Sequence, residues 1–339
     1  MRVDFRSDTV TKPTPEMKEF MMNAPVGDDV FEEDPTINEL EEYTANLFGK
    51  EAALYCSSGT QTNQIAINVH CKPGDELICS KEAHIYKYEG GGIASNSGTS
   101  VKLLDGDRGR IKAKDVKEAI NDPENVHYPL TSLVCLEDTM NRGGGAIYDI
   151  NDIKEIRALC DDERLPLHND GARIFNALIE NGIDYKTYAS YFDSISICLS
   201  KGLGAPVGSV LIGSKSFIKQ ARRVRKVFGG GMRQAGIIAA GGLYALKNNV
   251  DRLKIDHQHA QILADTLNKC SWVQEVLDVH TNIVVAKVNH EKSVMEAVHA
   301  MAEKDVHAMP FGPDTLRIVT HLDNSPEQIK YAQEVIENI

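Results

Sequence analysis

One stretch of the chain decides its fold, Ser194-Ile-Ser-Ile-Cys-Leu-Ser-Lys-Gly-Leu-Gly-Ala-Pro-Val-Gly208. An apolar run of the kind that forms a buried strand ends abruptly at Ser200-Lys201 and then breaks into glycines. A charged lysine is costly to bury, so a lysine at the mouth of a core strand needs a reason. We expect the Lys201 amine to be bonded to another group.

Similar apolar runs recur along the chain and alternate with helical patterns. They cover 76–79, 101–104, 132–137, 166–170 and 209–213. Near-continuous apolar strands alternating with helices indicate an α/β fold whose sheet is buried on both faces. The step from Ser200 to Ser209 is too short for a crossover helix. It predicts an antiparallel hairpin in an otherwise parallel sheet.

The C-terminal third predicts a small α+β domain. We expect one long helix over 236–269 that bridges to it. A strand, a helix, a strand and a last helix then follow over 282–288, 293–304, 315–320 and from 325 onward. The last helix opens with Ser325-Pro-Glu-Gln328, a capping-box pattern. The predicted domains are 1–250, which includes an N-terminal arm, and 251–339.

Composition and charge narrow the class of protein. The chain has 339 residues and a formal net charge of −12, which argues against a nucleic-acid or anionic-membrane partner. It has no long apolar run and no signal-peptide core, so we expect a cytoplasmic location. The seven cysteines are scattered and form no C-x-x-C pair. We interpret them as small buried hydrophobes in a reducing compartment.

Residues 1–35 are polar and rich in turns, yet they carry dense hydrogen-bonding groups among apolar residues. Examples are Asp4-Phe-Arg-Ser-Asp-Thr-Val-Thr11 and Val26-Gly-Asp-Asp-Val-Phe-Glu-Glu-Asp-Pro35. A flexible tail is one interpretation. We favour an arm that packs on a partner or near a site.

Two further features converge on the chemistry that Lys201 suggests. Ser57-Ser-Gly-Thr60 precedes a helical pattern, and free N–H groups at a helix start bind phosphate. An ordinary N-cap explains that motif equally well. Asp170 ends a buried strand, at the sheet edge where α/β folds bind ligands. A carboxylate there can keep a pyridine nitrogen protonated, so the set predicts pyridoxal phosphate held by Lys201 as a Schiff base.

His84 and Arg317 are weaker candidates on their own. His84 follows another predicted strand and can stack on an aromatic cofactor, although taken alone it is better explained as a surface or capping histidine. Arg317 is a cation amid apolar residues. It is explained either by a ligand's carboxylate or by an internal Asp or Glu.

Taken together, these motifs resemble the low-specificity L-threonine aldolases, a family of the aspartate-aminotransferase-like (fold type I) pyridoxal-phosphate enzymes. The resemblance spans almost the whole chain. It rests on Arg6-Ser-Asp-Thr-Val-Thr-Lys-Pro13, Val26-Gly-Asp-Asp-Val30, Glu33-Asp-Pro-Thr36, Gly49-Lys-Glu-Ala-Ala53, Ser58-Gly-Thr60, Asp170-Gly-Ala-Arg-Ile-Phe-Asn176, Cys198-Leu-Ser-Lys-Gly-Leu-Gly204, Ala205-Pro-Val-Gly-Ser209, Gly229-Gly-Gly-Met-Arg-Gln234 and Arg317-Ile-Val-Thr-His321. It implies a mostly parallel seven-stranded sheet sandwiched by helices, with a smaller C-terminal α+β domain.

The resemblance also implies roles for individual residues. Lys201 would form the Schiff base, Asp170 would hold the pyridine nitrogen, and His84 would stack on the ring. The other residues implied to bind the cofactor are Gly59, Thr60, Arg173, Ser200, Lys226 and Arg233, and the resemblance allows the last two to come from a neighbouring subunit. Those implied to bind the substrate are Ser7, Tyr88, Arg173 and Arg317. His127 matches a second histidine pointing at the substrate side chain.

The implied reaction is retro-aldol cleavage of L-threonine, L-allo-threonine and related β-hydroxy-α-amino acids to glycine and an aldehyde. His84 is the first candidate base, directly or through water, and His127 the second. The resemblance further implies glycine supply in amino-acid metabolism and a homotetramer, a dimer of dimers with active sites at the dimer interface. The sequence leaves open the preferred aldehyde and the threo or erythro preference.

Two departures from the family pattern and several rival interpretations remain. The family's Glu-Asn-Thr-His is Glu137-Asp-Thr-Met140 here, and Asn169 replaces a residue that is usually apolar. Both put the fine shape of the pocket in doubt.

The rival interpretations are another fold type I enzyme (an aminotransferase, a serine hydroxymethyltransferase-like enzyme or a C–S lyase), a dinucleotide loop at Gly202-Leu-Gly204, and a non-catalytic protein. We predict no metal site, since His257-Gln-His259 diverges on a helix and is expected to be solvated.

Overall fold

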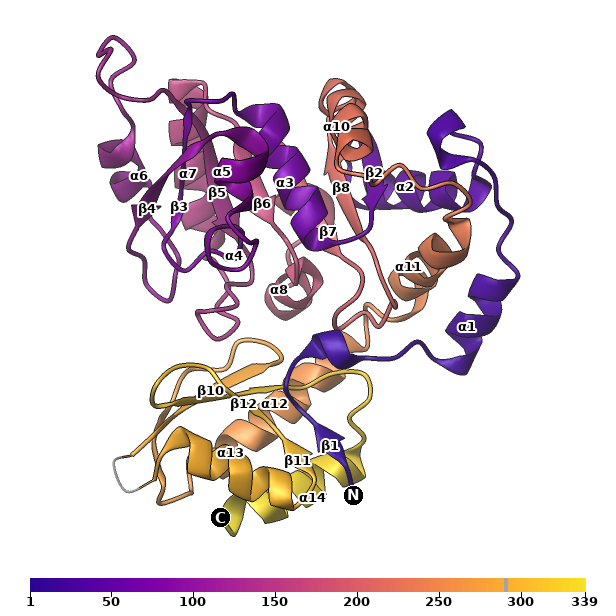
Figure 1. The fold of residues 1–339 in the computed structure, drawn as a ribbon. Helices are drawn as coiled ribbons and strands as arrows, with labels where there is room; N and C mark the ends of the chain where they lie inside the picture. The colour runs from indigo at the N-terminus through magenta and orange to yellow at the C-terminus, as the bar shows by residue number, and fades with distance from the viewer. Residues whose placement is uncertain (290–291) are drawn as a thin grey trace.

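A central seven-stranded sheet organises most of the chain in the computed structural model, which describes residues 1–289 and 292–339. Helices lie on both sides of the sheet (Figure 1). The strand order is β2-β8-β7-β6-β5-β3-β4. Their bounds are β2 (Ala52–Cys56), β3 (Glu76–Ser80), β4 (Ser100–Leu104), β5 (Thr131–Glu137), β6 (Leu167–Asp170), β7 (Ser194–Cys198) and β8 (Ser209–Gly213). The predicted α/β class and the seven strands are confirmed.

The sheet is parallel except at β8. This strand pairs antiparallel with both β7 and β2, which confirms the predicted hairpin. The register aligns Glu137 with Asp170 and Asp170 with Ser196, so three parallel strands end at one edge. Ligands bind at this edge in open α/β sheets. The topology therefore gathers the strand-end side chains at one place.

Eleven α-helices of the described chain accompany this sheet. They are α1 (Pro15–Met22), α2 (Pro35–Phe48), α3 (Gly59–His70), α4 (His84–Lys87), α5 (Gly92–Ser97), α6 (Ala113–Ala119), α7 (Ile150–Glu163), α8 (Ile174–Asn181), α9 (Tyr185–Ala189), α10 (Lys215–Val227) and α11 (Gly236–Asn248). The predicted stop of α2 at Gly49 is confirmed, because Gly49 takes the left-handed conformation with a φ of 64°. Leu40 and Phe48 of α2 are fully buried in the main core with Ile197 of β7.

The C-terminal part builds a second, smaller layer. It comprises α12 (Leu253–Leu267), β9 (Val273–Val276), β10 (Ile283–Val288), α13 (Val294–Glu303), β11 (Val306–His307), β12 (Met309–Pro310), β13 (Thr315–Val319) and α14 (Pro326–Glu337). Four of its strands form an antiparallel sheet in the order β12-β13-β10-β9. The Ser325–Gln328 capping box is present. The α+β character of this part is confirmed.

The N-terminal segment belongs structurally to this second layer. Strand β1 (Val3–Asp4) pairs in parallel with β11, and Val3 and Phe5 are buried in the C-terminal cluster. The chain then runs from the lower body in Figure 1, through the short helix Asp8–Val10, to α1 beside the sheet domain. The arm is packed rather than loose, and it crosses from one body to the other.

Two expectations were wrong. The single helix over 236–269 is two helices, because α11 ends at Asn248 and a turn precedes α12. Asn249 marks the break by donating its side-chain amide to the Leu203 carbonyl oxygen, 2.8 Å away. His257 and His259 are buried rather than solvated, and His257 contacts Glu180 Oε2 at 3.0 Å. The helix that carries them is covered on the face where we expected solvent.

Candidate active site

Lys201 lies on a tight turn directly after β7. Its carbonyl oxygen accepts hydrogen bonds from Gly204 N at 2.8 Å and from Thr11 Oγ1 at 3.0 Å. Gly204 has a φ of 81°, and a Cβ there would lie 2.7 Å from Leu322 Cδ2. Only glycine fits this position without strain. The glycines thus let the chain turn sharply at the lysine, and the Thr11 contact ties the arm to it.

The Lys201 side chain adjoins a cavity of about 130 Å³. The lining residues are Gly59, Thr60, Asn63, His84, Asp170, Ala172, Cys198, Ser200 and Lys201. Six of them were predicted from the sequence to bind the cofactor. They come from four separate elements, α3, α4, β6 and β7, and the segments that follow the two strands.

The start of α3 forms one wall. Ser58 is the N-cap, and its hydroxyl accepts from Gln61 N at 3.1 Å. Among the described residues, the backbone N–H groups of Gly59 and Thr60 have no partner. A Cβ on Gly59 would lie 2.5 Å from Cys198 Sγ, so only glycine allows this close approach. Two free N–H groups at a helix start suit a phosphate group.

Asp170, the last residue of β6, forms another part of the lining. It is almost fully buried. Its Oδ2 accepts from Asn63 Nδ2 at 2.9 Å, and its Oδ1 accepts from Ala172 N at 3.1 Å. Neither partner is a cation. The carboxyl group is therefore held in place by uncharged donors, an arrangement that suits a partner for a protonated ring nitrogen.

His84 opens α4 and borders the cavity. Its Nδ1 lies 3.0 Å from Glu89 Oε1, which leaves Nε2 as the free ring nitrogen. Burial alone would lower the pKa of His84, but the hydrogen bond to Glu89 and the nearby carboxyl groups of Asp170 and Glu137 outweigh it and raise the pKa. A histidine with a raised pKa and one free nitrogen is suited to accept a proton.

A second cavity of about 300 Å³ shares His84 with the first. Its lining also includes Tyr88, Asn141, Arg142, Met309, Pro310, Phe311 and Arg317. Arg317 donates from Nη1 to Asn141 Oδ1 and from Nη2 to the Arg6 carbonyl oxygen, both at 3.1 Å. Its Nε is buried without a partner, and no carboxylate among the described residues pairs with it.

The surroundings of Arg317 favour one of the two explanations that the sequence left open. Burial, helped by the nearby guanidinium of Arg173, lowers the pKa of Arg317 to about 10. A buried cation without an anionic partner favours binding of an anion from outside. The ligand's carboxylate is therefore the better explanation.

Arg173 differs from Arg317 because it has an internal partner. Its Nε and Nη2 donate to the two carboxyl oxygens of Asp8 at 2.7 and 2.6 Å, and both side chains are buried. Burial alone would raise the pKa of Asp8, but Arg173, with Lys201 and Asn282, holds it well below its usual range. Nη1 is the part of Arg173 without a partner among the described residues. Asp8 thus fixes the orientation of this arginine.

Comparison with known proteins identifies the family. The model of the beta-eliminating lyase family matches residues 4–291. A low specificity L-threonine aldolase of Escherichia coli K12 is 43% identical over 328 residues, 96% of each chain. A probable low-specificity L-threonine aldolase of Arabidopsis thaliana is 41% identical over 99% of this chain and 97% of its own.

The chain belongs to the low-specificity L-threonine aldolase family. Among solved structures, a threonine aldolase of Leishmania major superposes with a TM-score of 0.85 at 22% identity, over 99% of this chain and 98% of that one. A serine palmitoyltransferase of Sphingomonas wittichii superposes with a TM-score of 0.79 at 14% identity, over 99% and 86%. These matches show that the aldolase chain shares its fold with other fold type I enzymes.

Within the aldolase chain, five predicted site residues are outside the lining of both cavities, and the three of them that are exposed are His127, Lys226 and Arg233. His127 is on an exposed turn, where its backbone N–H donates to Asn125 Oδ1 at 3.1 Å. Lys226 is exposed at the end of α10. Arg233 is exposed and pairs with Asp28 Oδ2 at 2.9 Å.

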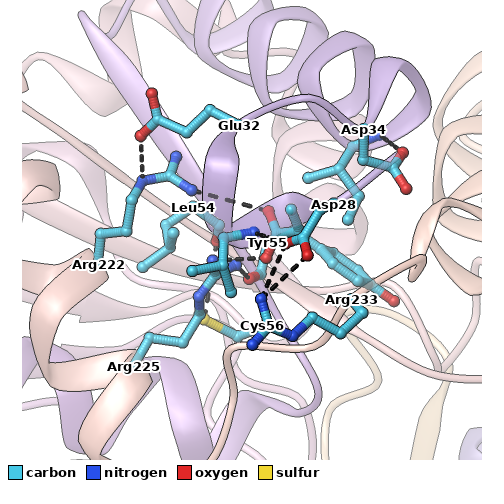
Figure 2. A network of polar contacts seen from close by, with 12 residues as sticks. Asp28, Glu32, Asp34, Leu54, Tyr55, Cys56, Arg222, Arg225 and Arg233 are labelled. Atoms are coloured by element: carbon cyan, nitrogen blue, oxygen red, sulfur yellow. Dashed lines mark hydrogen bonds and ion pairs between the residues drawn. The ribbon is translucent and has the colours of Figure 1, made fainter. Parts of the chain in front are cut away.

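Figure 2 shows the polar network that holds Arg233. The buried Arg225 donates to the Tyr55 carbonyl oxygen and to Asp29 Oδ2, both at 2.6 Å. Arg222 pairs with Glu32 at 3.2 Å. The network thus fixes the 28–34 segment of the arm against α10.

The remaining predicted residues line or flank the site. Ser7 is the N-cap of the short helix that begins at Asp8, and its hydroxyl group accepts from Thr9 N at 3.2 Å. Tyr88 is half-exposed, with its ring centre 5.5 Å from that of His84. Ser200 precedes Lys201 in the first cavity.

Sequence reasoning missed four buried residues that support the site, namely Asp8, Asn63, Glu89 and Glu137. Glu137 accepts from His84 N at 2.7 Å and from Asn141 N at 2.9 Å. It therefore connects a residue that lines both cavities with a residue that lines the second. Burial, with the neighbouring Asp170, raises its pKa. One signal was available for Asn63, which follows Gly59 by one helical turn and so faces the same side of α3.

Proposed function

We propose that the protein is a pyridoxal-phosphate-dependent aldehyde-lyase that cleaves L-threonine, L-allo-threonine and related β-hydroxy-α-amino acids to glycine and an aldehyde. The observation that carries the proposal is the meeting of Lys201, Asp170 and the free N–H groups of α3 in one cavity that adjoins the unpaired Arg317. The names of the E. coli and Arabidopsis relatives support it.

The residues of the first cavity fit pyridoxal phosphate. The free N–H groups of Gly59 and Thr60 would hold the phosphate, Asp170 the ring nitrogen, and the Lys201 amine the aldehyde carbon. A fold neighbour is a serine palmitoyltransferase solved with pyridoxal phosphate, with a TM-score of 0.77. When bound, the cofactor supplies an electron sink for the bond that breaks at the substrate's Cα.

Orientation of the substrate selects the bond. Arg317 would bind the substrate carboxylate, and Arg173, near enough to lower the pKa of Arg317, would offer its unpartnered Nη1 to the same anion. With the carboxylate fixed, the Cα–Cβ bond is presented for cleavage. His84 Nε2 would then accept the proton of the β-hydroxyl group, directly or through water. Glu89, bonded to Nδ1, stabilises the charge that His84 acquires.

The fold alone leaves a rival, because other fold type I enzymes share it. An aminotransferase requires a keto-acid acceptor, and a serine hydroxymethyltransferase-like enzyme requires folate. Release of glycine and acetaldehyde from L-threonine with neither addition distinguishes the aldolase. The identity of the relatives over nearly the whole chain favours the aldolase.

We further propose a homotetramer whose subunits complete one another's sites. His127, Lys226 and Arg233 match site residues of the family, yet each lies on the surface outside its own cavities. Phe31 and Val227, both largely exposed, flank the network that holds Arg233. Association with another subunit at this surface would remove both apolar side chains from water. Light scattering that shows a monomer at assay concentration would overturn this assembly.

A cytoplasmic role in amino-acid metabolism, with glycine as a product, completes the proposal. All seven cysteines are free, which suits a reducing compartment. In the described part of the chain, no helix has both the length and the apolar character needed to cross a membrane.

Lys201→Ala tests the proposed function, with Lys219→Ala as the matched control on an exposed helix face. We expect the purified parent and the control to be yellow and to cleave L-threonine. The Lys201→Ala protein should lose the visible absorbance and the cleavage together. Full activity of Lys201→Ala would refute the assignment.

A further inference from the structure

Asn63 joins two carboxyl groups behind the cofactor cavity. Its side chain is buried, and its Nδ2 lies 2.9 Å from Glu89 Oε1 and 2.9 Å from Asp170 Oδ2. An amide nitrogen carries two hydrogens. Asn63 therefore donates one to each carboxyl group, and so connects the partner of His84 with the proposed partner of the cofactor ring.

The two carboxyl groups need a donor between them. Oxygens of Glu89 and Asp170 lie within 4.8 Å of each other, and both residues are buried. Like charges at this separation repel strongly when water is excluded. The shared amide offsets the repulsion and sets the direction of both groups. Gln64 also stabilises the Glu89 carboxyl group, because its Nε2 donates to Glu89 Oε2 at 2.7 Å.

A buried chain of hydrogen bonds fixes which way the Asn63 amide points. Its Oδ1 lies 3.2 Å from His168 Nε2, His168 Nδ1 lies 2.8 Å from Ser194 Oγ, and Ser194 Oγ lies 2.9 Å from His70 Nε2. Since the Asn63 NH₂ group faces two acceptors, its oxygen must face His168. His168 then donates from Nε2 and accepts at Nδ1.

The protonation of the two histidines agrees with this direction. Burial lowers the pKa of His168 to about 3 and that of His70 to about 4, so both rings are neutral and each has a single N–H group. His70 donates to Ser194, Ser194 donates to His168, and His168 donates to Asn63. Every bond in the chain points toward the two carboxyl groups.

We propose that Asn63 is a positioning residue that orients Asp170 toward the cofactor and Glu89 toward His84, and that His168, as the Nε2–H tautomer, holds the Asn63 amide in that orientation. The proposal rests on the proposed function, because it assigns the carboxyl groups their parts in the same site. It adds that cofactor binding and proton transfer depend on one buried amide.

A simple packing role for Asn63 predicts a different outcome. If the side chain only filled space on α3, a leucine of similar size would serve, and the loss of its hydrogen bonds would leave the active site intact. If it positions both carboxyl groups, cofactor retention and turnover should fall together. Substrate binding should be spared, since Arg317 and Asn141 do not contact this chain of residues.

Asn63→Leu and Asn63→Asp test this on the purified holoprotein, with Asn68→Asp as the control. Asn68 lies on the same helix, but its amide donates to the Asn96 carbonyl oxygen at a partly exposed position. Pyridoxal phosphate release on dilution, the visible spectrum, kcat and KM for L-threonine are measured. Each variant loses a hydrogen bond to a charged group. We therefore expect the rate constant of pyridoxal phosphate release to rise, and kcat to fall, by about 10-fold to 100-fold in both variants.

The control and the Michaelis constant make the result specific. We expect Asn68→Asp to stay within about twofold of the parent in every quantity, and KM of the Asn63 variants to change by no more than about threefold. Asn63→Leu that retains cofactor, spectrum and kcat like the parent would overturn the proposal. A parent protein that binds no pyridoxal phosphate would instead overturn the proposed function.

His168→Gln and His168→Leu test the orientation of the amide without touching Asn63. A glutamine side chain can donate to Asn63 Oδ1 in place of the imidazole, whereas leucine cannot. We expect His168→Leu to share the defects of Asn63→Leu and His168→Gln to remain within about threefold of the parent. Equal behaviour of the two His168 variants, both impaired or both unimpaired, would refute the tautomer's role.

Discussion

The pairing of Asp8 with Arg173 is predicted to stabilise the whole protein, and Asp8→Asn tests it. The carboxyl group is fully buried and bonded through both oxygens to the guanidinium, which is itself buried. Asparagine keeps the shape and removes the charge, so Arg173 is left as an unpaired buried cation. Breaking a buried ion pair in this way costs about 3–5 kcal/mol.

The expected shift in melting temperature follows from chain length. At about 2.1 cal/mol/K per residue, the unfolding entropy of a 339-residue chain is about 0.7 kcal/mol/K. A loss of 3–5 kcal/mol then lowers Tm by about 4–7 °C at pH 7. Thermal unfolding followed by circular dichroism measures it.

Asp4→Asn is the matched control in the same arm. Asp4 also pairs with an arginine, Arg6, but that side chain is 47% exposed. An exposed pair contributes about 0–1 kcal/mol, so Tm should move by no more than about 1–2 °C. Equal shifts for Asp8→Asn and Asp4→Asn would refute the reasoning that burial makes the Asp8 pair strong.

The same pair fixes the sign of a pH effect. The folded-state pKa of Asp8 is depressed, so the stabilisation is complete above the unfolded-state pKa of about 4 and is lost progressively as the pH falls from there through the lower folded value. The difference in Tm between the parent and Asp8→Asn should therefore be constant from pH 8 to about pH 5 and shrink below about pH 4. A difference that vanished already at pH 6 would contradict this linkage.

Three further predictions concern the site. Arg317→Lys should raise KM for L-threonine by about 10-fold to 100-fold with the visible absorbance unchanged, and an unchanged KM would show that the arginine is structural. Glu89→Gln removes a group that raises the pKa of His84, so the acidic limb of the kcat/KM profile should move to lower pH; a shift to higher pH would contradict the sign. Gly59→Ala places a Cβ 2.5 Å from Cys198 Sγ and should weaken cofactor retention, measured by gel filtration, while full retention would show that the α3 start is not the phosphate anchor.

Much of the site was predictable because strand ends are visible in the sequence. Lys201 and Asp170 each close an apolar run, and parallel strands bring their ends to one edge. The antiparallel β8 followed from a connection too short for a helix. Local patterns of this kind identify the site residue and predict where the fold places it.

The partners of those residues were not predictable, because they depend on contacts distant in sequence. Asp8 meets Arg173 across 165 positions, and Asn63 meets Asp170 across 107. The buried environment of His257 is likewise set by Glu180 on another helix. The two family departures show the same limit, since Asn169 and Asp138 both contact the hydroxyl of Tyr188 in the core.

One measurement tests the central claim most directly. The purified protein, saturated with pyridoxal phosphate, is incubated with L-threonine in the absence of keto acid and folate, and glycine and acetaldehyde are quantified. The account predicts equal amounts of both products from the parent and none from Lys201→Ala. No glycine from the parent, or a keto acid in its place, would contradict it.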